Sequence, residues 1–320
     1  MASLLIIGGS GFFGKSILDA YKRGLLSPWG IDLVYVFARN ADRLKKEAPE
    51  LMDPSVKLVN GDITTCKEIP IADYVIHAAA STNASSYLSQ PEVEKRNIQA
   101  GTYNYCDLAK KFHQNSLIVY CSSGAVYGRQ PPDLDKISES YDGGSLSEIS
   151  STKQDYAAAK RDAESAIHQL GRDGVKVSIA RCFAFIGAYL PRDQHFAIGN
   201  FIEDGLHNRP ITVKADHLVY RSYMYSDDLV LWLMEIAENA SDQCPIFNVG
   251  SDEAISLEDL AKKIGLYFNV PVCRNSVSSC EVDRYIPCIK KAKKMNLKLK
   301  YDLDTAVRET AIRVLKRVHI

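Results

Sequence analysis

A tyrosine and a lysine four residues apart are the residues of this sequence best placed to do chemistry. Tyr156 and Lys160 are separated by three alanines, and this spacing places both side chains on one face of a helix. A free tyrosine has a pKa of about 10, and a neighbouring ammonium favours the phenolate, so the pair can exchange a proton with a sugar or alcohol oxygen near neutral pH. Ordinary helix surfaces also carry this spacing, so the pair predicts catalysis only in combination with other signals.

The first such signal is a glycine-rich turn near the N-terminus. Residues 3–7 form a short apolar run typical of a buried parallel strand, and an amphipathic helical pattern begins at residue 15. Between them, Gly8, Gly11 and Gly14 fit the spacing of a dinucleotide fingerprint, and Gly9 offers a second match. Without Cβ atoms, this backbone can approach a pyrophosphate at the helix N-terminus. The alternative is a flexible glycine loop that binds nothing.

Charge and hydropathy exclude several classes of protein. Basic and acidic residues number 39 each, which gives no electrostatic case for nucleic acid or for an anionic membrane as a partner. The basic run 290–294 is interpreted as a solvated helix face. The sequence contains no apolar stretch long enough for a membrane span and no signal-peptide pattern, so we expect a cytoplasmic protein. Its eight cysteines are scattered without metal-site spacing, and neither a metal nor a disulfide is predicted.

The order of the elements predicts the fold class. Apolar segments at 31–37, 56–59, 74–77, 117–120 and 175–180 alternate with amphipathic helical patterns, which indicates an α/β protein with a doubly wound parallel sheet, the Rossmann arrangement. We expect a dinucleotide-binding domain over 1–180, which also receives the segment of about 223–249, and a smaller mixed α/β substrate domain over 181–320. Ligands of such sheets bind beyond the carboxyl ends of the strands.

Together these motifs resemble the extended short-chain dehydrogenases/reductases, in particular the NAD(P)-dependent epimerases, dehydratases and reductases of nucleotide sugars. The resemblance covers nearly the whole chain. It rests on nine motifs in the family's order: Gly8-x-x-Gly11-x-x-Gly14, Gly61-Asp62-Ile63, His77-x-Ala79-Ala80, Asn97 with Gly101-Thr102-x-Asn104, Ser122-Ser123-Gly124-Ala125-Val126-Tyr127-Gly128, Tyr156-x-x-x-Lys160, Arg221-Ser222-Tyr223-x-Tyr225-x-x-Asp228, Phe247-Asn248-Val249-Gly250 and Asp283-Arg284-Tyr285.

The resemblance implies roles for individual residues. Ser123, Tyr156 and Lys160 would be catalytic: Ser123 bonds the reacting sugar oxygen, Tyr156 exchanges the proton, and Lys160 bonds the nicotinamide ribose and supports the phenolate. The cofactor would be bound by Gly8, Gly11, Phe12, Phe13, Gly14, Arg39, Asp62, Ile63, Ala79, Asn97 and Lys160. The substrate would be bound by Ser81, Ser123, Tyr156, Asn200, Arg221 and Arg284, of which the two arginines suit a diphosphate. Arg192 and His195 lie where the family's substrate loop begins.

Two departures from the family pattern narrow the reaction. Where many 4,6-dehydratases carry two acids, this chain has Gly124 and Ala125, so dehydration is set aside. At the end of the second strand, the acid that would bind the ribose of NAD is missing and Arg39 follows instead, with Arg43 and Lys46 nearby. A cation there suits a 2′-phosphate, so NADP(H) is favoured over NAD(H). Ala184, in place of a frequent asparagine, predicts a more apolar sugar pocket.

These observations predict an NADPH-dependent reductase of a nucleotide-linked 4-keto-6-deoxy sugar, with hydride delivered to C4 and Tyr156 as proton donor. A nucleotide-sugar 4-epimerase that retains NAD is the alternative within the fold. A non-catalytic NADP-binding sensor and a carbonyl reductase of a non-nucleotide substrate are further alternatives. The resemblance also implies a homodimer, formed through a four-helix bundle of the helix near residues 92–112 and the helix carrying Tyr156.

Overall fold

The computed structural model describes residues 2–79, 90–192, 194 and 196–318. The chain divides into two compact units. The first unit comprises Met1–Gly128, Ser145–Cys182 and Val230–Phe247. The second comprises Arg129–Gly144, Phe183–Leu229 and Asn248–Ile320. The segment Arg129–Gly144, which sequence analysis assigned to the first domain, therefore lies in the second unit.

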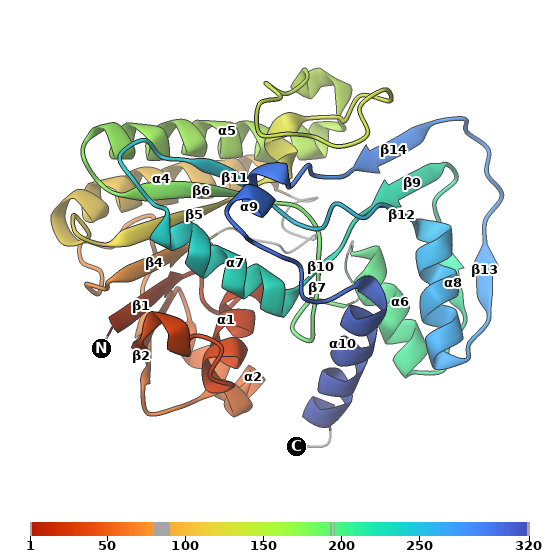
Figure 1. The fold of residues 1–320 in the computed structure, drawn as a ribbon, viewed down its shortest axis with the longest axis horizontal. Coiled ribbons are helices and arrows are strands. Elements are labelled where there is room, and N and C mark those ends of the chain that lie inside the picture. Colours follow the sequence, from red (N-terminus) through yellow and green to blue (C-terminus); the bar gives the residue numbers. More distant parts are fainter. Residues whose placement is uncertain (1, 80–89, 193, 195, 319–320) are drawn as a thin grey trace. The chain divides into compact units, whose positions relative to one another are not determined.

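A seven-stranded sheet forms the centre of the first unit (Figure 1). Its strand order is β11-β6-β5-β4-β1-β2-β3, and the neighbouring strands from β6 to β3 pair in parallel. The strands are β1 (Ala2–Ile7), β2 (Ile31–Ala38), β3 (Val56–Asn60), β4 (Tyr74–His77), β5 (Leu117–Ser123), β6 (Val177–Cys182) and β11 (Ile246–Val249). The predicted doubly wound parallel sheet is confirmed, because chain order reverses on either side of β1.

Helices cover both faces of this sheet, as its apolar strands require. The helices are α1 (Phe12–Lys22), α2 (Leu44–Glu47), α4 (Pro91–Phe112), α5 (Ser151–Arg172) and α7 (Ser226–Glu238), the last of which continues from the second unit. Helices α4 and α5 lie side by side on one face (Figure 1), where Tyr105 and Leu108 of α4 share a buried cluster with Ala159 and Ala163 of α5. Small side chains on α5 allow the two helices to approach closely.

The second unit is built from short strands and helices. Its strands are β7 (Phe185–Ile186), β8 (Ile211–Val213), β9 (Leu218–Arg221), β10 (Met224–Tyr225), β12 (Ile255–Ser256), β13 (Val272–Arg274) and β14 (Val282–Tyr285). They form one three-stranded sheet, β12-β9-β14, and two ribbons, β10-β7 and β13-β8. The helices are α6 (Ala197–Leu206), α8 (Leu257–Phe268), α9 (Lys290–Lys294) and α10 (Leu303–Val318). Gly205 of α6 lies against the ring of Phe268, which lets α6 pack on α8.

No helix among the described residues is both long enough and apolar enough to cross a membrane. Within the same residues, no group of three or more histidine, cysteine, aspartate and glutamate side chains has the arrangement of a metal site.

Candidate active site

The glycine turn between β1 and α1 is shaped by packing at some positions and left open at one. Gly8 has φ +85°, and a Cβ there would lie 2.7 Å from Ala79 Cα. A Cβ on Gly14 would overlap the Gly9 carbonyl. Gly11 differs, because it is exposed and a Cβ there would meet no atom closer than 3.5 Å. Packing therefore explains Gly8 and Gly14, whereas the bare Gly11 is suited to the close approach of a ligand.

Gly11 is also the N-cap of α1, and it contributes no side-chain capping bond. The helix begins at Phe12, which is buried, and Phe13, which is half-buried, and the two rings meet edge to face at 5.7 Å. The first turn contains no acidic residue. A helix N-terminus of this kind favours an anion, since its N–H groups and its dipole point outward. The turn thus fits the pyrophosphate of a dinucleotide.

The end of β2 presents one cation that is not neutralised. Arg39 is exposed and forms no hydrogen bond or ion pair with any other residue that the structure describes. Arg43, by contrast, donates from Nε to Glu47 at 2.8 Å, and Lys45 pairs with Asp42 at 2.6 Å. Among these neighbours, Arg39 is the guanidinium with its full charge available to an anionic ligand.

The loop after β3 carries Asp62 and Ile63 and is held in place by α4. The Asp62 carboxylate accepts hydrogen bonds from the backbone N–H (2.9 Å) and the hydroxyl (2.8 Å) of Thr64. Asn104 donates from its side-chain amide to the carbonyl of Ile63 at 2.9 Å, and Gly101 lies beneath Ile63. Sequence analysis named Gly101 and Asn104 only as parts of a motif. Their contacts show that they anchor the loop expected to receive the adenosine.

Lys160 is almost completely buried, with 2% of its surface exposed. Its ammonium donates to the Cys121 carbonyl at 2.9 Å and to the Tyr120 hydroxyl at 3.3 Å, both on β5. The same Nζ lies 5.9 Å from the centre of the Tyr156 ring. None of the ion pairs among the described residues involves Lys160, so only neutral groups hold this charge.

The surroundings of Lys160 keep it charged and keep its neighbours neutral. Burial works to lower the pKa of Lys160, but the oxygens of Tyr120 and Tyr156 outweigh it, and the pKa is raised. Burial raises the pKa of Tyr120, against the opposing effect of the ammonium, so its phenol stays protonated. Burial, and secondly the nearby ammonium, lowers the pKa of His77 on β4 to about 3, so this imidazole is neutral at physiological pH.

Ser123 and Tyr156 come from neighbouring parts of the first unit. Ser123 ends β5 and caps the short 3₁₀ helix η4 (Gly124–Tyr127), where its hydroxyl accepts from the Ala125 N–H at 3.2 Å. Ser123 is half-buried, whereas Ser122 is buried, so Ser123 has the larger exposed fraction of the two. The role of Ser123 as the reactive-site serine stays a prediction. Arg161 donates to the Val126 carbonyl at 2.7 Å and so ties this turn to the helix of the half-buried Tyr156.

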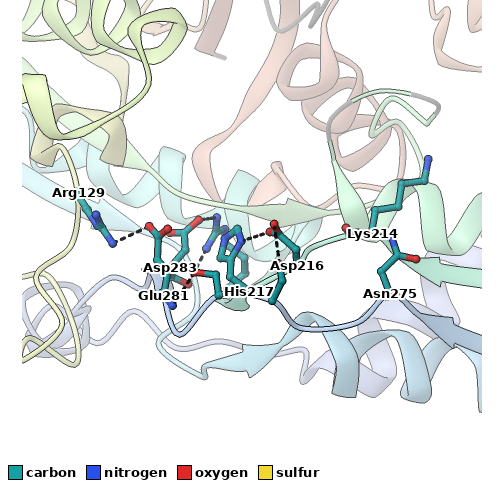
Figure 2. Close-up of polar contacts among 10 residues, drawn as sticks. Arg129, Lys214, Asp216, His217, Asn275, Glu281 and Asp283 are labelled. Carbon is teal, nitrogen blue, oxygen red and sulfur yellow. Dashed lines mark hydrogen bonds and ion pairs between the residues drawn. The ribbon is translucent and has the colours of Figure 1, made fainter.

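The two arginines expected to bind a diphosphate lie on adjacent strands of the second unit. In the register of β14 with β9, Arg284 is opposite Tyr220 and Tyr285 is opposite Arg221. Arg221 donates to the Asp283 carboxylate at 2.6 Å and to the Tyr220 carbonyl at 2.8 Å, and Arg284 stacks 4.7 Å from the centre of the Tyr220 ring. Figure 2 shows Asp283 beside Glu281, which pairs with Arg129 at 2.7 Å. Sequence analysis assigned no role to Asp283.

The remaining predicted residues are less tightly placed. Asn200 of α6 is half-buried and donates to the Gln194 carbonyl at 2.7 Å. Arg192 pairs with Glu203 at 2.6 Å. Asn97 is exposed on α4, and its side chain forms no hydrogen bond with the part of the chain that the structure describes. Ser81 and His195 lie outside the described residues.

Comparison with known proteins gives a consistent result. Residues 4–250 match the model of the NAD-dependent epimerase/dehydratase family. UDP-glucuronic acid decarboxylase 5 of Arabidopsis thaliana is 29% identical over 262 residues, which is 82% of this chain and 73% of the relative. UDP-glucuronic acid decarboxylase 3 of the same plant is 28% identical over 91% of this chain and 82% of its own.

Solved structures share the fold at lower identity. A UDP-N-acetylglucosamine 4-epimerase from Methanobrevibacter ruminantium superposes with a TM-score of 0.81 at 19% identity, covering 99% of both chains. A dTDP-glucose 4,6-dehydratase from Streptomyces venezuelae, solved with NAD bound, has a TM-score of 0.79 at 20% identity and covers 98% of this chain and 97% of its own.

Proposed function

The chain belongs to the NAD-dependent epimerase/dehydratase family, and from that premise we propose that it reduces a nucleotide-linked 4-keto-6-deoxy sugar with NADPH. The reaction would add hydride to C4 and a proton to the C4 oxygen. The observation that carries the choice of a reductase is Arg39, the exposed and unpaired guanidinium at the end of β2. Such a cation suits the 2′-phosphate of NADPH, a cosubstrate that is released after each turnover.

The cofactor would lie along the carboxyl ends of the strands of the first unit. Gly11 and the first turn of α1, with Phe12 and Phe13, would face the pyrophosphate, and Gly8 and Gly14 would maintain the turn. The remaining cofactor contacts are proposed for Arg39, Asp62, Ile63, Ala79, Asn97 and Lys160. When bound, the nicotinamide supplies the hydride.

The chain's own residues would handle the proton. Tyr156 donates it to the sugar oxygen, and Ser123 orients the same oxygen by a hydrogen bond. Lys160 keeps a positive charge near the Tyr156 ring and offers an N–H to the ribose. Proton donors held in position by packed helices and strands need little rearrangement during the reaction.

Recognition of the nucleotide diphosphate is proposed for the second unit. The planar guanidinium of Arg221, and with it Arg284, can form paired hydrogen bonds with phosphate oxygens. Asn200 and Ser81 complete the proposed substrate set. Arg221 Nη2 already donates to the Asp283 carboxylate at 2.6 Å, so one N–H of this guanidinium serves an anion in the structure, which supports the proposal.

The test begins with mass spectrometry of the nucleotides that co-purify with the protein. A reductase is expected to retain little cofactor, or NADP. Purified protein is then mixed with NADPH and nucleotide-linked 4-keto-6-deoxy sugars, and loss of the reduced nicotinamide absorbance is followed. Tightly retained NAD, together with no NADPH oxidation, would remove the reductase proposal.

A nucleotide-sugar 4-epimerase that regenerates NAD in each turnover is the second candidate. It is supported by a relative described as UDP-glucuronate 4-epimerase 2 of Arabidopsis thaliana, 26% identical over 85% of this chain and 65% of its own. The decarboxylase relatives add UDP-glucuronate to the substrates to be assayed, and release of CO2 from it would replace both proposals.

A non-catalytic sensor is disfavoured because the buried Lys160 and neighbouring Tyr156 are retained.

We also propose that the protein acts in the cytoplasm as a homodimer through a four-helix bundle of α4 and α5. The exposed Tyr103 and Val93 of α4 are suited to such an interface. Sedimentation at micromolar concentration tests this assembly, and a monomer there would contradict it.

A further inference from the structure

The hydrogen-bond chain behind Lys160 extends through one residue of β5 for which sequence analysis gave no role. Tyr120 is completely buried, and its hydroxyl lies 3.3 Å from the Lys160 ammonium and 3.4 Å from the Thr102 hydroxyl. Thr102 in turn donates to the Ile98 carbonyl at 2.8 Å, one turn earlier in α4. The chain therefore links three elements of the first unit: α5, β5 and α4.

The direction of these bonds follows from the number of protons available. A hydroxyl has one proton, and Thr102 uses its proton on the Ile98 carbonyl. Thr102 must then accept from Tyr120, whose own oxygen is left to accept from Lys160. Because both hydroxyls have a fixed role, the Tyr120 oxygen presents a lone pair to the ammonium.

This arrangement accounts for two of the three N–H groups of Lys160. One points to the Cys121 carbonyl and one to Tyr120, and the third remains for a ligand. Both acceptors are neutral, so they orient the ammonium without cancelling its charge. A carboxylate in the place of Tyr120 would also hold the lysine, but it would remove the positive charge that the Tyr156 ring experiences at 5.9 Å.

We propose that Tyr120 is a positioning residue, which aims the ammonium of Lys160 at the cofactor ribose and at Tyr156. The proposal rests on the proposed function of Lys160. Tyr120 would touch neither cofactor nor substrate. Thr102 would act one step further back, by fixing the direction in which the Tyr120 hydroxyl donates.

The core supplies a matched control. Tyr105 is also completely buried, in the same cluster, but its hydroxyl bonds His113 Nδ1 at 3.4 Å and not Lys160. Tyr105→Phe and Tyr120→Phe therefore remove the same atom from the same core. A purely structural role predicts similar results for both, whereas a positioning role separates them.

The first readout is the affinity for NADPH by isothermal titration, with thermal melting to establish folding. Tyr120→Phe is expected to weaken NADPH binding by about three- to tenfold, since an N–H of a buried ammonium loses its acceptor. Tyr105→Phe should bind like the parent. Thr102→Val should reproduce part of the loss and Thr102→Ser should restore it, and this pair decides the matter if Tyr120→Phe does not fold.

The second readout is the split between kcat and the KM for NADPH in steady-state kinetics. Tyr120→Phe is expected to lower kcat as well as to raise KM, because a displaced ammonium serves neither Tyr156 nor the ribose as it does in the parent. Tyr105→Phe, which leaves the bonds of Lys160 in place, should leave both constants near those of the parent.

Lys160→Met separates failure of the inference from failure of the proposed function. If Lys160→Met loses NADPH affinity while Tyr120→Phe behaves like Tyr105→Phe in both readouts, Tyr120 is not a positioning residue and the proposed function stands. If Lys160→Met binds NADPH as the parent does, the proposed role of Lys160 is wrong, and the inference falls with it.

Discussion

The two units hold their key cations in opposite ways. Lys160 in the first unit is buried and is held by a carbonyl and a phenol, both neutral. Arg221 in the second unit is partly exposed and is held by the carboxylate of Asp283. Neutral acceptors orient a charge and leave its field intact, whereas a carboxylate orients a charge and compensates it. The first cation is thus ready to act on its neighbours, whereas in the proposed complex with a diphosphate the second would exchange one anion for another.

The largest expected effect tests whether the uncompensated Lys160 acts through Tyr156. Tyr156→Phe removes the proton donor and keeps the ring, so turnover should fall by about a hundred- to ten-thousandfold with NADPH affinity nearly unchanged. Steady-state kinetics and titration calorimetry measure the two quantities. Tyr21→Phe, which removes a hydroxyl bonded to Ser55, is the control. Turnover within a few-fold of the parent would take Tyr156 out of the mechanism.

Lys160→Met should damage turnover and NADPH affinity together, because the proposed role of its ammonium is to serve both the ribose and Tyr156. The same assays apply. Loss of turnover alone would mean that the cofactor does not use the third N–H of Lys160.

Substitutions in the glycine turn test whether cofactor binding by the first unit depends on the backbone of this turn. Gly11→Ala should fold with a melting temperature near that of the parent, since a Cβ there meets nothing closer than 3.5 Å. The same variant should bind NADPH about tenfold more weakly or worse, because the added Cβ would keep the pyrophosphate from approaching the backbone closely. Gly14→Ala should instead destabilise the fold, because its Cβ overlaps the Gly9 carbonyl. If Gly11→Ala binds NADPH like the parent, the pyrophosphate does not lie against Gly11.

Arg39, like Lys160, is a cation without an anionic partner among the described residues. Its removal should change the affinity for NADPH and the affinity for NADH by different amounts. A charge-assisted hydrogen bond of about 1.5 to 3 kcal/mol is lost in Arg39→Ala, so NADPH affinity should fall by about ten- to a hundredfold and NADH affinity should barely change. Arg43→Ala is the control, because Arg43 is engaged with Glu47. Equal losses for both cofactors, or tighter binding of NADH by the parent, would favour the epimerase.

The smallest expected effect concerns Arg221, whose charge is compensated by the carboxylate of Asp283. Asp283→Asn removes the anion that competes for Arg221, and binding of UDP should tighten by about two- to fivefold, the modest value of a partly exposed ion pair. Glu281→Gln alters the neighbouring acid, which pairs with Arg129, and should leave UDP affinity unchanged. Weaker UDP binding by Asp283→Asn would mean that Asp283 orients Arg221 for the ligand and does not compete with it.

Local patterns in the sequence were sufficient to predict the parallel sheet and the order of its elements. The alternation of apolar segments with amphipathic helices, and the glycine turn after the first strand, depend on residues close together in the chain. The pair Tyr156 and Lys160 was found for the same reason, because four-residue spacing is a property of one helix. The roles assigned to Arg39, Ser123 and the other site residues remain predictions, supported by where the structure places them.

The partners of these residues were decided by tertiary structure alone. Tyr120 precedes Lys160 by 40 residues and lies in an apolar strand, where an aromatic residue is ordinarily a core residue. Asp283 is 62 residues from Arg221, and the two meet because β14 pairs with β9. Periodicity and spacing report on neighbours along the chain. Whether a buried cation meets a phenol or a carboxylate depends on which strands and helices the fold brings together.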